Sequence, residues 1–204
     1  MDYFKKTWEA TKATMLNLPE VEVKVRLATN NDPWGPSTTQ MRELAHQSNS
    51  FHDFPIIMNT IWLRMNDDGK NWRHIYKAMT LLDFLVKNGS EQVVREARVH
   101  MIEIQTLTQF QHIDENDKDV GASVREKAKQ LSELLHDDHR IREERDKARR
   151  MAHKFREAIS SDGRAFGSGW SGGGGGGNEY GGGGGGGYGG YGSGSGGYGG
   201  GGGR

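Results

Sequence analysis

An abrupt change of composition near Gly167 limits what this chain can fold into. Before that point the sequence is mixed and rich in charge, and after it the chain is almost entirely glycine with serine and tyrosine. A segment with so little apolar surface cannot offset the entropy lost on folding. We therefore expect residues 159–204 to form a disordered tail, acting as a linker or in weak self-association through its tyrosines. The preceding ~160 residues suffice for one domain with a core.

Composition also excludes several classes of protein. The chain has no cysteine, which rules out disulfides, cysteine-based zinc sites and thiol catalysis. No apolar run is long enough to cross a bilayer, and the N-terminus lacks the apolar core of a signal peptide. The formal net charge is zero, from 27 basic and 27 acidic side chains. Binding of an anion must therefore come from local clusters of cations.

Hydrophobic periodicity predicts a succession of short α-helices between residues 37 and 158, which indicates an all-α stack. Ser37 and Gln40 form a capping box, and a second capping box is expected at residues 123–126. Asp53 is expected to cap another helix. Gly89 is expected to end a helix in the left-handed conformation.

The segment Val21–Leu27 fits two structures. Its strict alternation of apolar and polar side chains favours a strand. Yet Val21, Val25 and Ala28 also share one face of a helix, and Pro19 suits a first helical turn. Periodicity alone leaves both interpretations open and leans to the strand.

The first 18 residues have the pattern of an amphipathic helix. Phe4, Trp8 and Met15 lie on one face. Three lysines lie around and opposite that face: Lys5, Lys6 and Lys12. The pattern is compatible with a first core helix, with a frayed terminus, or with a helix that binds a membrane surface.

Signatures of catalysis are missing from the sequence. There is no G-x-S-x-G, Walker A or H-E-x-x-H motif, so we expect no enzymatic activity. His136 and His139 lie beside two aspartates and could imitate metal ligands. An exposed position at a helix end is the simpler interpretation, and we expect no metal or other cofactor.

Cationic residues gather in two parts of the chain. Lys24 and Arg26 precede the Asn30–Asn31 loop, and a second group surrounds the turn at residues 66–69. That second group comprises Arg64, Lys70, Arg73, His74 and Lys77. A phosphorylated inositol ring needs several fixed donors that converge from different elements. Spacing alone does not show convergence, so ordinary surface charge remains the alternative.

Five sequence motifs resemble the epsin N-terminal homology (ENTH) family in order and in spacing. They are KVRLATNNDPWGPS at 24–37, NDDGKNWRHIYKAMTL at 66–81, KNGSE at 87–91, VREKAK at 124–129 and RIREER at 140–145. The resemblance covers roughly residues 3 to 155. It implies a superhelical stack of α-helices with an N-terminal amphipathic helix, here residues 1–18 before a core at 19–158. It also implies a helix at Val21–Leu27 and no enzymatic activity.

The resemblance further implies a phosphoinositide headgroup site and a membrane-inserting segment. The headgroup ligands would be Arg26, Asn31, Arg64, Lys70, His74 and Lys77, joined by Lys5, Lys6 and Lys12. Arg73 matches no ligand of the family. Phe4, Trp8 and Met15 would enter the outer leaflet, each contributing about 1.5–3 kcal/mol on burial.

Partners follow from the same resemblance. It implies membranes containing phosphatidylinositol 4,5-bisphosphate or 4-phosphate, and a cytoplasmic protein peripheral to plasma, endosomal or trans-Golgi membranes in vesicle budding. Clathrin or adaptor coats and SNARE proteins are family partners, and a SNARE-type protein-binding module is the alternative function. The family's clathrin and adaptor motifs do not occur after Phe155, so either the chain is a fragment or the tail replaces them. Nucleic acid is not expected, because the tail lacks RGG-type arginine.

Overall fold

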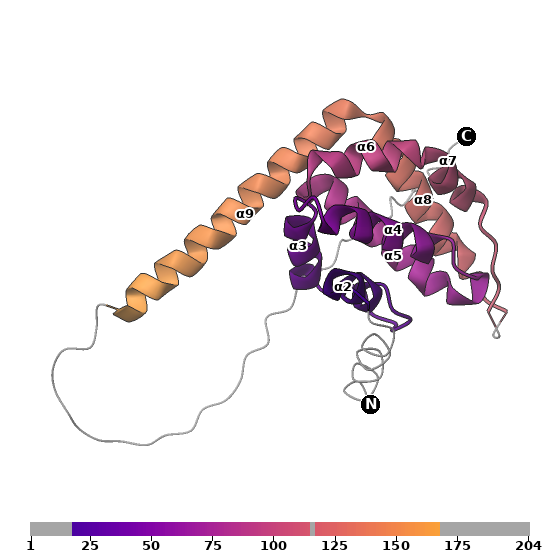
Figure 1. Ribbon diagram of the computed structural model, residues 1–204, viewed down its shortest axis with the longest axis horizontal. Helices are drawn as coiled ribbons and strands as arrows, with labels where there is room; N and C mark the ends of the chain where they lie inside the picture. Colours follow the sequence, from indigo (N-terminus) through magenta and orange to yellow (C-terminus); the bar gives the residue numbers. More distant parts are fainter. Residues whose placement is uncertain (1–17, 115–116, 168–204) are drawn as a thin grey trace, which may run out of the picture. The chain divides into compact units, whose positions relative to one another are not determined.

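The computed structural model describes residues 18–114 and 117–167, with the side chains of all of these except 155 and 158–167. Within these ranges the chain is an all-α stack (Figure 1), with a single isolated bridge between Ile113 and Asp119 and no strand. The elements in order are α2 Glu20–Ala28, α3 Thr38–Gln47, α4 Asp53–Met65, η1 Gly69–Asn71, α5 Trp72–Asn88, α6 Glu91–Val99, α7 Met101–Thr106, η2 Leu107–Gln109, α8 Gly121–His136 and α9 Asp138–Gly167. The expected N-terminal helix lies outside the described residues.

Helix α5 is the centre of the stack and packs against α3, α4, α6 and α8. Apolar side chains recur along it at helical spacing on more than one face, which suits a helix with neighbours on several sides. Its fully buried members include Ile75, Met79, Leu82 and Leu85. The core around them continues through Ile57 and Ile61 of α4, Val93 of α6, Ile104 of α7 and Leu131 of α8. Helix α5 therefore links one end of the domain to the other.

The segment Val21–Leu27 is helical, as the family resemblance implied and against the strand favoured by its alternation. Val21, Val25 and Ala28 are the buried residues of α2, and Pro19 precedes its first turn. Helix α2 packs against α3 and α4. The intervening charged residues form pairs beside the core instead of facing it: Lys24 binds Glu20 of α2 and Glu43 of α3. Tertiary packing thus overrides the local alternation.

Helix starts agree with the sequence at one of three positions. The capping box of Ser37 and Gln40 forms at the start of α3. At α4 the prediction was wrong, because Asp53 is the first helical residue and His52 occupies the cap position. The Asp53 backbone N–H bonds instead to the Ser50 hydroxyl at 3.3 Å.

The second expected capping box was also wrong. Helix α8 begins at Gly121, so Ser123 lies inside its first turn. The backbone N–H groups of Val120 and Gly121 donate to the His112 carbonyl. Asp119 accepts hydrogen bonds from Arg125 and from the backbone of Gly121, and these contacts hold its pKa below the ordinary value. A contact with a preceding loop, not a local serine, therefore sets the start of this helix.

The corner between α5 and α6 is held from two sides. Gly89 ends α5 with φ −89° and ψ −167°, an extended conformation, so the left-handed conformation expected for it was wrong. The Ser48 hydroxyl accepts from the Ser90 backbone N–H at 2.9 Å. From the other side, the Arg145 guanidinium donates to the carbonyls of Val86 and Gly89. Two carbonyls that lack a helical partner are thereby satisfied.

Helix α9 joins the stack through its first turns. Ile141 is buried against the core and Arg145 is buried beneath the α5–α6 corner. The following described side chains up to 157 are mostly exposed. The helix continues to Gly167, into the segment that composition assigned to the tail. The described residues divide into two units after Gly163, and of the second unit the structure describes only the end of α9.

Candidate functional site

The candidate site lies where the α2–α3 loop meets the start of α5. Asn30 and Asn31 follow the last turn of α2 directly. The Asn31 side-chain amide donates to the Asn71 Oδ1 atom at 3.0 Å, and the Lys77 Nζ atom donates to the Asn30 Oδ1 atom at 2.8 Å. Two hydrogen bonds between distant parts of the chain therefore fix this loop against α5.

A second set of contacts extends from Asn71 to the end of α4. The Asn71 amide donates to Asp67 Oδ1 at 3.0 Å. The other oxygen of Asp67 lies 2.7 Å from the His74 Nδ1 atom, and Arg64 Nη1 lies 3.8 Å from that oxygen. Because a carboxylate only accepts, His74 Nδ1 donates in this bond. One carboxylate thus orients both an imidazole and a guanidinium.

Hydrogen bonding keeps Asp67 ionised. Burial acts to raise the pKa of Asp67, but hydrogen bonds from His74, Asn71 and the Asp68 backbone outweigh it and lower the pKa below the ordinary value. The ionised carboxylate holds Arg64 and His74, whose side chains are 14% and 12% exposed, before any ligand arrives. Such pre-organisation reduces the entropy cost of binding.

Lys77 is the most unusual cation of the site. The residue is 4% exposed, and its ammonium bonds to the neutral Asn30 amide. No carboxylate lies at ion-pair distance from it among the residues that the structure describes. Burial lowers the pKa of Lys77; Asp32 opposes that shift and Arg73 adds to it. A buried ammonium without an ionic partner gains more than an exposed one from an incoming anion.

Two hollows open beside Lys77. One, of about 440 Å³, is also lined by Asn30, Trp34 and Gln40. The other, of about 210 Å³, is also lined by Trp72 and Arg73. Residues of the Asp32–Trp34 loop line both hollows together with Lys77.

The remaining expected ligands are less closely joined. Lys70 lies in η1, is 74% exposed and pairs with Asp68 at 3.3 Å. Arg26 occupies the last turn of α2 and binds Glu22 one turn earlier, with no contact to the network in the described part of the chain. Arg73, which was left out, stacks its guanidinium 4.7 Å from the Trp72 ring. Lys5, Lys6, Lys12, Phe4, Trp8 and Met15 lie outside the described residues.

Sequence reasoning missed three members of the network: Asn30, Asp67 and Asn71. All are uncharged or acidic, and the search was for cations. Asn30 and Asn71 adjoin predicted residues in the two longest family motifs, and that adjacency was the available signal. The structure shows that they position the cations.

Other expected features have ordinary surroundings. His136 and His139 are exposed at the end of α8 and the start of α9, and His136 bonds to the Ser132 carbonyl. The described residues contain no cluster that could hold a metal ion. None of their helices is long and apolar enough to cross a membrane.

Together these observations define an all-helical domain in which Asp67 orients Arg64 and His74 and in which Lys77 lies buried against the α2–α3 loop. The family model described as "ENTH domain" matches residues 18–141, and the chain belongs to this family.

The chain is 56% identical over 158 residues to the protein named Epsin of Dictyostelium discoideum, covering 78% of this chain and 23% of that protein. It is 43% identical to the structure of the epsin-2 ENTH domain in complex with phosphatidylinositol 4,5-bisphosphate, with a TM-score of 0.64 over 67% of this chain and 96% of that one. Helical ANTH and ENTH tubules on membranes containing this lipid match at 39% identity, with a TM-score of 0.64 over 74% and 97% of the two chains. The chain spans about a quarter of the length of the curated relatives it matches.

Proposed function

We propose that this chain is a phosphoinositide-binding adaptor that attaches peripherally to a membrane during vesicle formation. Lys77 carries the proposal: a buried ammonium, 4% exposed, with a neutral partner and two hollows beside it. Such an arrangement stabilises the folded domain poorly, because burial of a charge is costly. A phosphate of a bound headgroup would supply the missing negative charge.

Several donors can act on one phosphorylated ring. Arg64 and His74 are held by Asp67, and Lys70 lies in η1, directly before α5. The first N–H groups of α5 have no side-chain cap and add positive potential at this end. Arg26 lies one turn before the Asn30–Asn31 loop and would reach the ligand from α2. Donors on four elements suit phosphates that point in different directions.

The comparisons support the choice of lipid. Two similar structures contain phosphatidylinositol 4,5-bisphosphate, one in complex with epsin-2 and one in membrane tubules. We therefore propose this lipid as the ligand, and plasma or endosomal membranes as the location. No chemical step is needed for this role, so the proposed adaptor is not an enzyme.

We also propose that residues 1–18 insert into the membrane. Phe4, Trp8 and Met15 would enter the outer leaflet, while Lys5, Lys6 and Lys12 contact headgroup phosphates. Pairing of an apolar face with lysines is typical of helices that lie in the interface.

Co-sedimentation with vesicles tests the headgroup site. The variant K70E/K77M reverses one exposed charge and replaces the buried ammonium by a methionine of similar length. We expect binding to vesicles containing phosphatidylinositol 4,5-bisphosphate to fall at least about tenfold, equivalent to ~1.4 kcal/mol. The thermal midpoint should not fall, because the buried charge contributes little stability.

The control variant K118E/K129Q makes the same change of net charge at two exposed lysines outside the network. It should bind nearly as well as the wild type. Equal losses in both variants would show that binding follows net charge and not this site. Unchanged binding by K70E/K77M would overturn the site, and the protein-binding alternative would then be favoured.

A further inference from the structure

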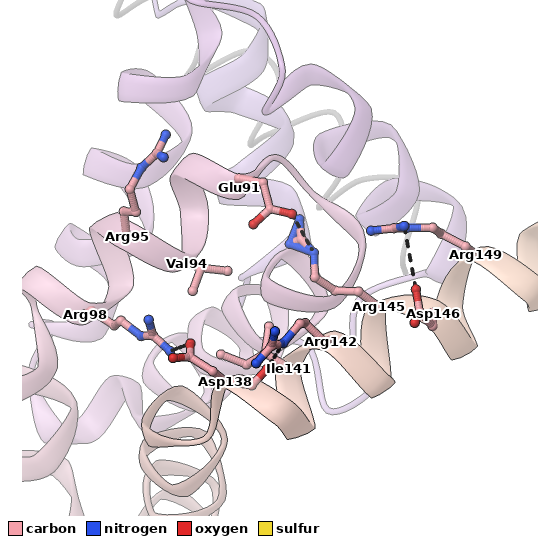
Figure 2. A pocket seen from close by; sticks show the side chains of 10 residues that line it. All are labelled: Glu91, Val94, Arg95, Arg98, Asp138, Ile141, Arg142, Arg145, Asp146 and Arg149. Atoms are coloured by element: carbon pink, nitrogen blue, oxygen red, sulfur yellow. Dashed lines mark hydrogen bonds and ion pairs between the residues drawn. The ribbon is translucent and has the colours of Figure 1, made fainter.

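A groove of about 540 Å³ lies between α6 and the first turns of α9, and the headgroup proposal does not involve it. Figure 2 shows its lining, with two arginines from α6 and three from α9. These residues are Arg95, Arg98, Arg142, Arg145 and Arg149. On each helix they are spaced by three or four residues, so each set shares one helical face. The lining also contains three carboxylates, which leaves an excess of two positive charges.

Two of the arginines serve the fold. Arg145 is buried, holds the carbonyls of Val86 and Gly89, and has its Nε atom 3.4 Å from a carboxylate oxygen of Glu91. Arg98 pairs with Asp138 and donates to the Leu135 carbonyl at 2.9 Å. The dashed contacts of Arg98 and Arg145 in Figure 2 join α6 to α9. These guanidiniums are engaged and are not available to a ligand.

The remaining arginines carry the excess charge. Arg149 contacts Asp146 at 3.6 Å, a loose pair on the exposed surface. Arg142 donates only its Nε–H, to the Asp138 carbonyl, so its two terminal NH₂ groups have no partner within the described ranges. Arg95 is exposed and forms neither a hydrogen bond nor an ion pair in the described part of the chain. The available guanidiniums are therefore those of Arg95 and Arg142, one on each wall.

Between these walls the groove contains apolar side chains. Val94 and Ile141 line it and are 7% and 5% exposed. Guanidinium groups bind carboxylates through paired hydrogen bonds, and the apolar surface between them suits one apolar side chain. These features fit a short protein segment with acidic residues around an apolar one.

The groove and the headgroup site lie toward opposite ends of α5. The groove adjoins the C-terminal end of α5, where Arg145 binds Val86 and Gly89. The proposed headgroup site, which includes Lys77, adjoins the N-terminal end of the same helix. Helix α5 has 17 residues, so its ends are about 25 Å apart. An occupant of the groove is therefore separate from a headgroup bound at the other end of α5. We propose that the groove binds an acidic segment of a partner protein.

Fluorescence anisotropy at low ionic strength tests this proposal with the whole chain. The probe is a labelled peptide with glutamates on both sides of one leucine, and its counterpart has glutamine for glutamate. We expect the wild type to bind the glutamate peptide and not the glutamine peptide. The variant R95E/R142E should bind it at least about tenfold more weakly. The control R140E/R150E makes the same charge change at exposed positions of α9 outside the groove and should bind within about twofold of the wild type.

Vesicles containing phosphatidylinositol 4,5-bisphosphate provide the second measurement. R95E/R142E should bind them as the wild type does, and K70E/K77M should still bind the peptide. The groove proposal is overturned if the wild type does not bind the glutamate peptide, or if R95E/R142E and R140E/R150E lose peptide binding equally. It is also overturned if R95E/R142E loses vesicle binding and keeps peptide binding. Because the two sites are read separately, failure of one proposal is distinguishable from failure of the other.

Discussion

The backbone at Gly89 leaves no room for a side chain. A Cβ atom there would lie 2.7 Å from the Leu85 carbonyl oxygen and 2.8 Å from the Ser48 hydroxyl. The φ angle of −89° is one that any residue adopts, so crowding, not the torsion, requires glycine. The same corner receives the Arg145 guanidinium, which prevents the backbone from moving outward. Glycine here allows three helices and a serine to meet.

Substitution of this glycine should measure that crowding. We expect G89A to lower the free energy of unfolding by about 1–3 kcal/mol, because either the Ser48 contact or the end of α5 must shift. Gly35 offers a matched control, since an added Cβ would meet no atom within 4 Å. Urea unfolding of both variants provides the measurement. Equal midpoints for G89A and G35A would contradict this account of the corner.

For single residues, the sequence predicted positions in the helices but not the partners that contact them. Gly89 was expected to end a helix, and α5 ends there. The conformation of Gly89 depends on Ser48 and Arg145, which contact it from distant positions in the chain. Lys77 likewise bonds to Asn30, 47 residues away. Local spacing contains no information about such partners. The clustering of cations supplied most of the candidate ligands of the core, and the family resemblance added Asn31.

Among the elements, α5 and α8 share a paired carboxylate. The Asp83 carboxylate accepts from Lys87 of α5 and from Lys127 of α8, each at 2.9 Å. Asp83 and Lys127 are 18% and 15% exposed, so solvent screens the pair only in part. Burial acts to raise the pKa of Asp83, but the two lysines outweigh it and lower the pKa below the ordinary value. The carboxylate therefore stabilises the packing of α8 on α5 while it is ionised.

The pH dependence of D83N should report this pair. A carboxyl group whose folded pKa is lowered contributes stability above its unfolded pKa and loses it as the pH falls through the folded value. We expect D83N to lose about 1–3 kcal/mol near neutral pH, because Lys127 remains part-buried without its partner. The difference from the wild type should shrink as the pH falls below the unfolded value of about 3.9 and through the lower folded pKa of Asp83.

Denaturant unfolding across the acid range measures this difference, with E133Q on the exposed face of α8 as the control of equal charge. A difference in unfolding free energy between D83N and the wild type that stays constant down to the lowest pH would contradict this account. It would show that the asparagine side chain disturbs packing and that loss of the charge is not the cause. E133Q should follow the wild type throughout.

Helix existence was predictable from the sequence, whereas helix starts were predictable only where the signal is local. Ser37 and Gln40 lie three residues apart and cap each other as expected. The start of α8 depends on His112 in the preceding loop, so the nearby serine was a false signal. The strand that alternation favoured at Val21–Leu27 was wrong. The polar side chains between its valines pair with charges beside the core, so the segment can be helical. Such pairs let a helix contain residues that alternate as in a strand.

For the whole molecule, the proposed membrane attachment has two parts: the headgroup site and residues 1–18. The variant F4S/W8S separates them. Each large side chain contributes about 1.5–3 kcal/mol when it enters the leaflet, so vesicle binding should weaken while the thermal midpoint stays nearly unchanged. Circular dichroism should show helix gained on addition of phosphatidylinositol 4,5-bisphosphate, and less of it in the variant.

A control for this change is available inside the described domain. Phe51 and Ile102 are 94% and 78% exposed, so F51S/I102S removes apolar surface without touching the first 18 residues. It should bind vesicles normally. If F4S/W8S melts several degrees lower and still binds as the wild type does, Phe4 and Trp8 belong to the core.

Helix α5 separates two charged environments by its own length. Its 17 residues span about 25 Å, roughly three Debye lengths at physiological salt, where one Debye length is ~8 Å. The charge of a headgroup bound at the N-terminal end is therefore largely screened from a segment bound beside Gly89. An acidic partner could dock there without repulsion from the bound headgroup, and its affinity should be the same whether the headgroup site is empty or filled by a soluble inositol phosphate.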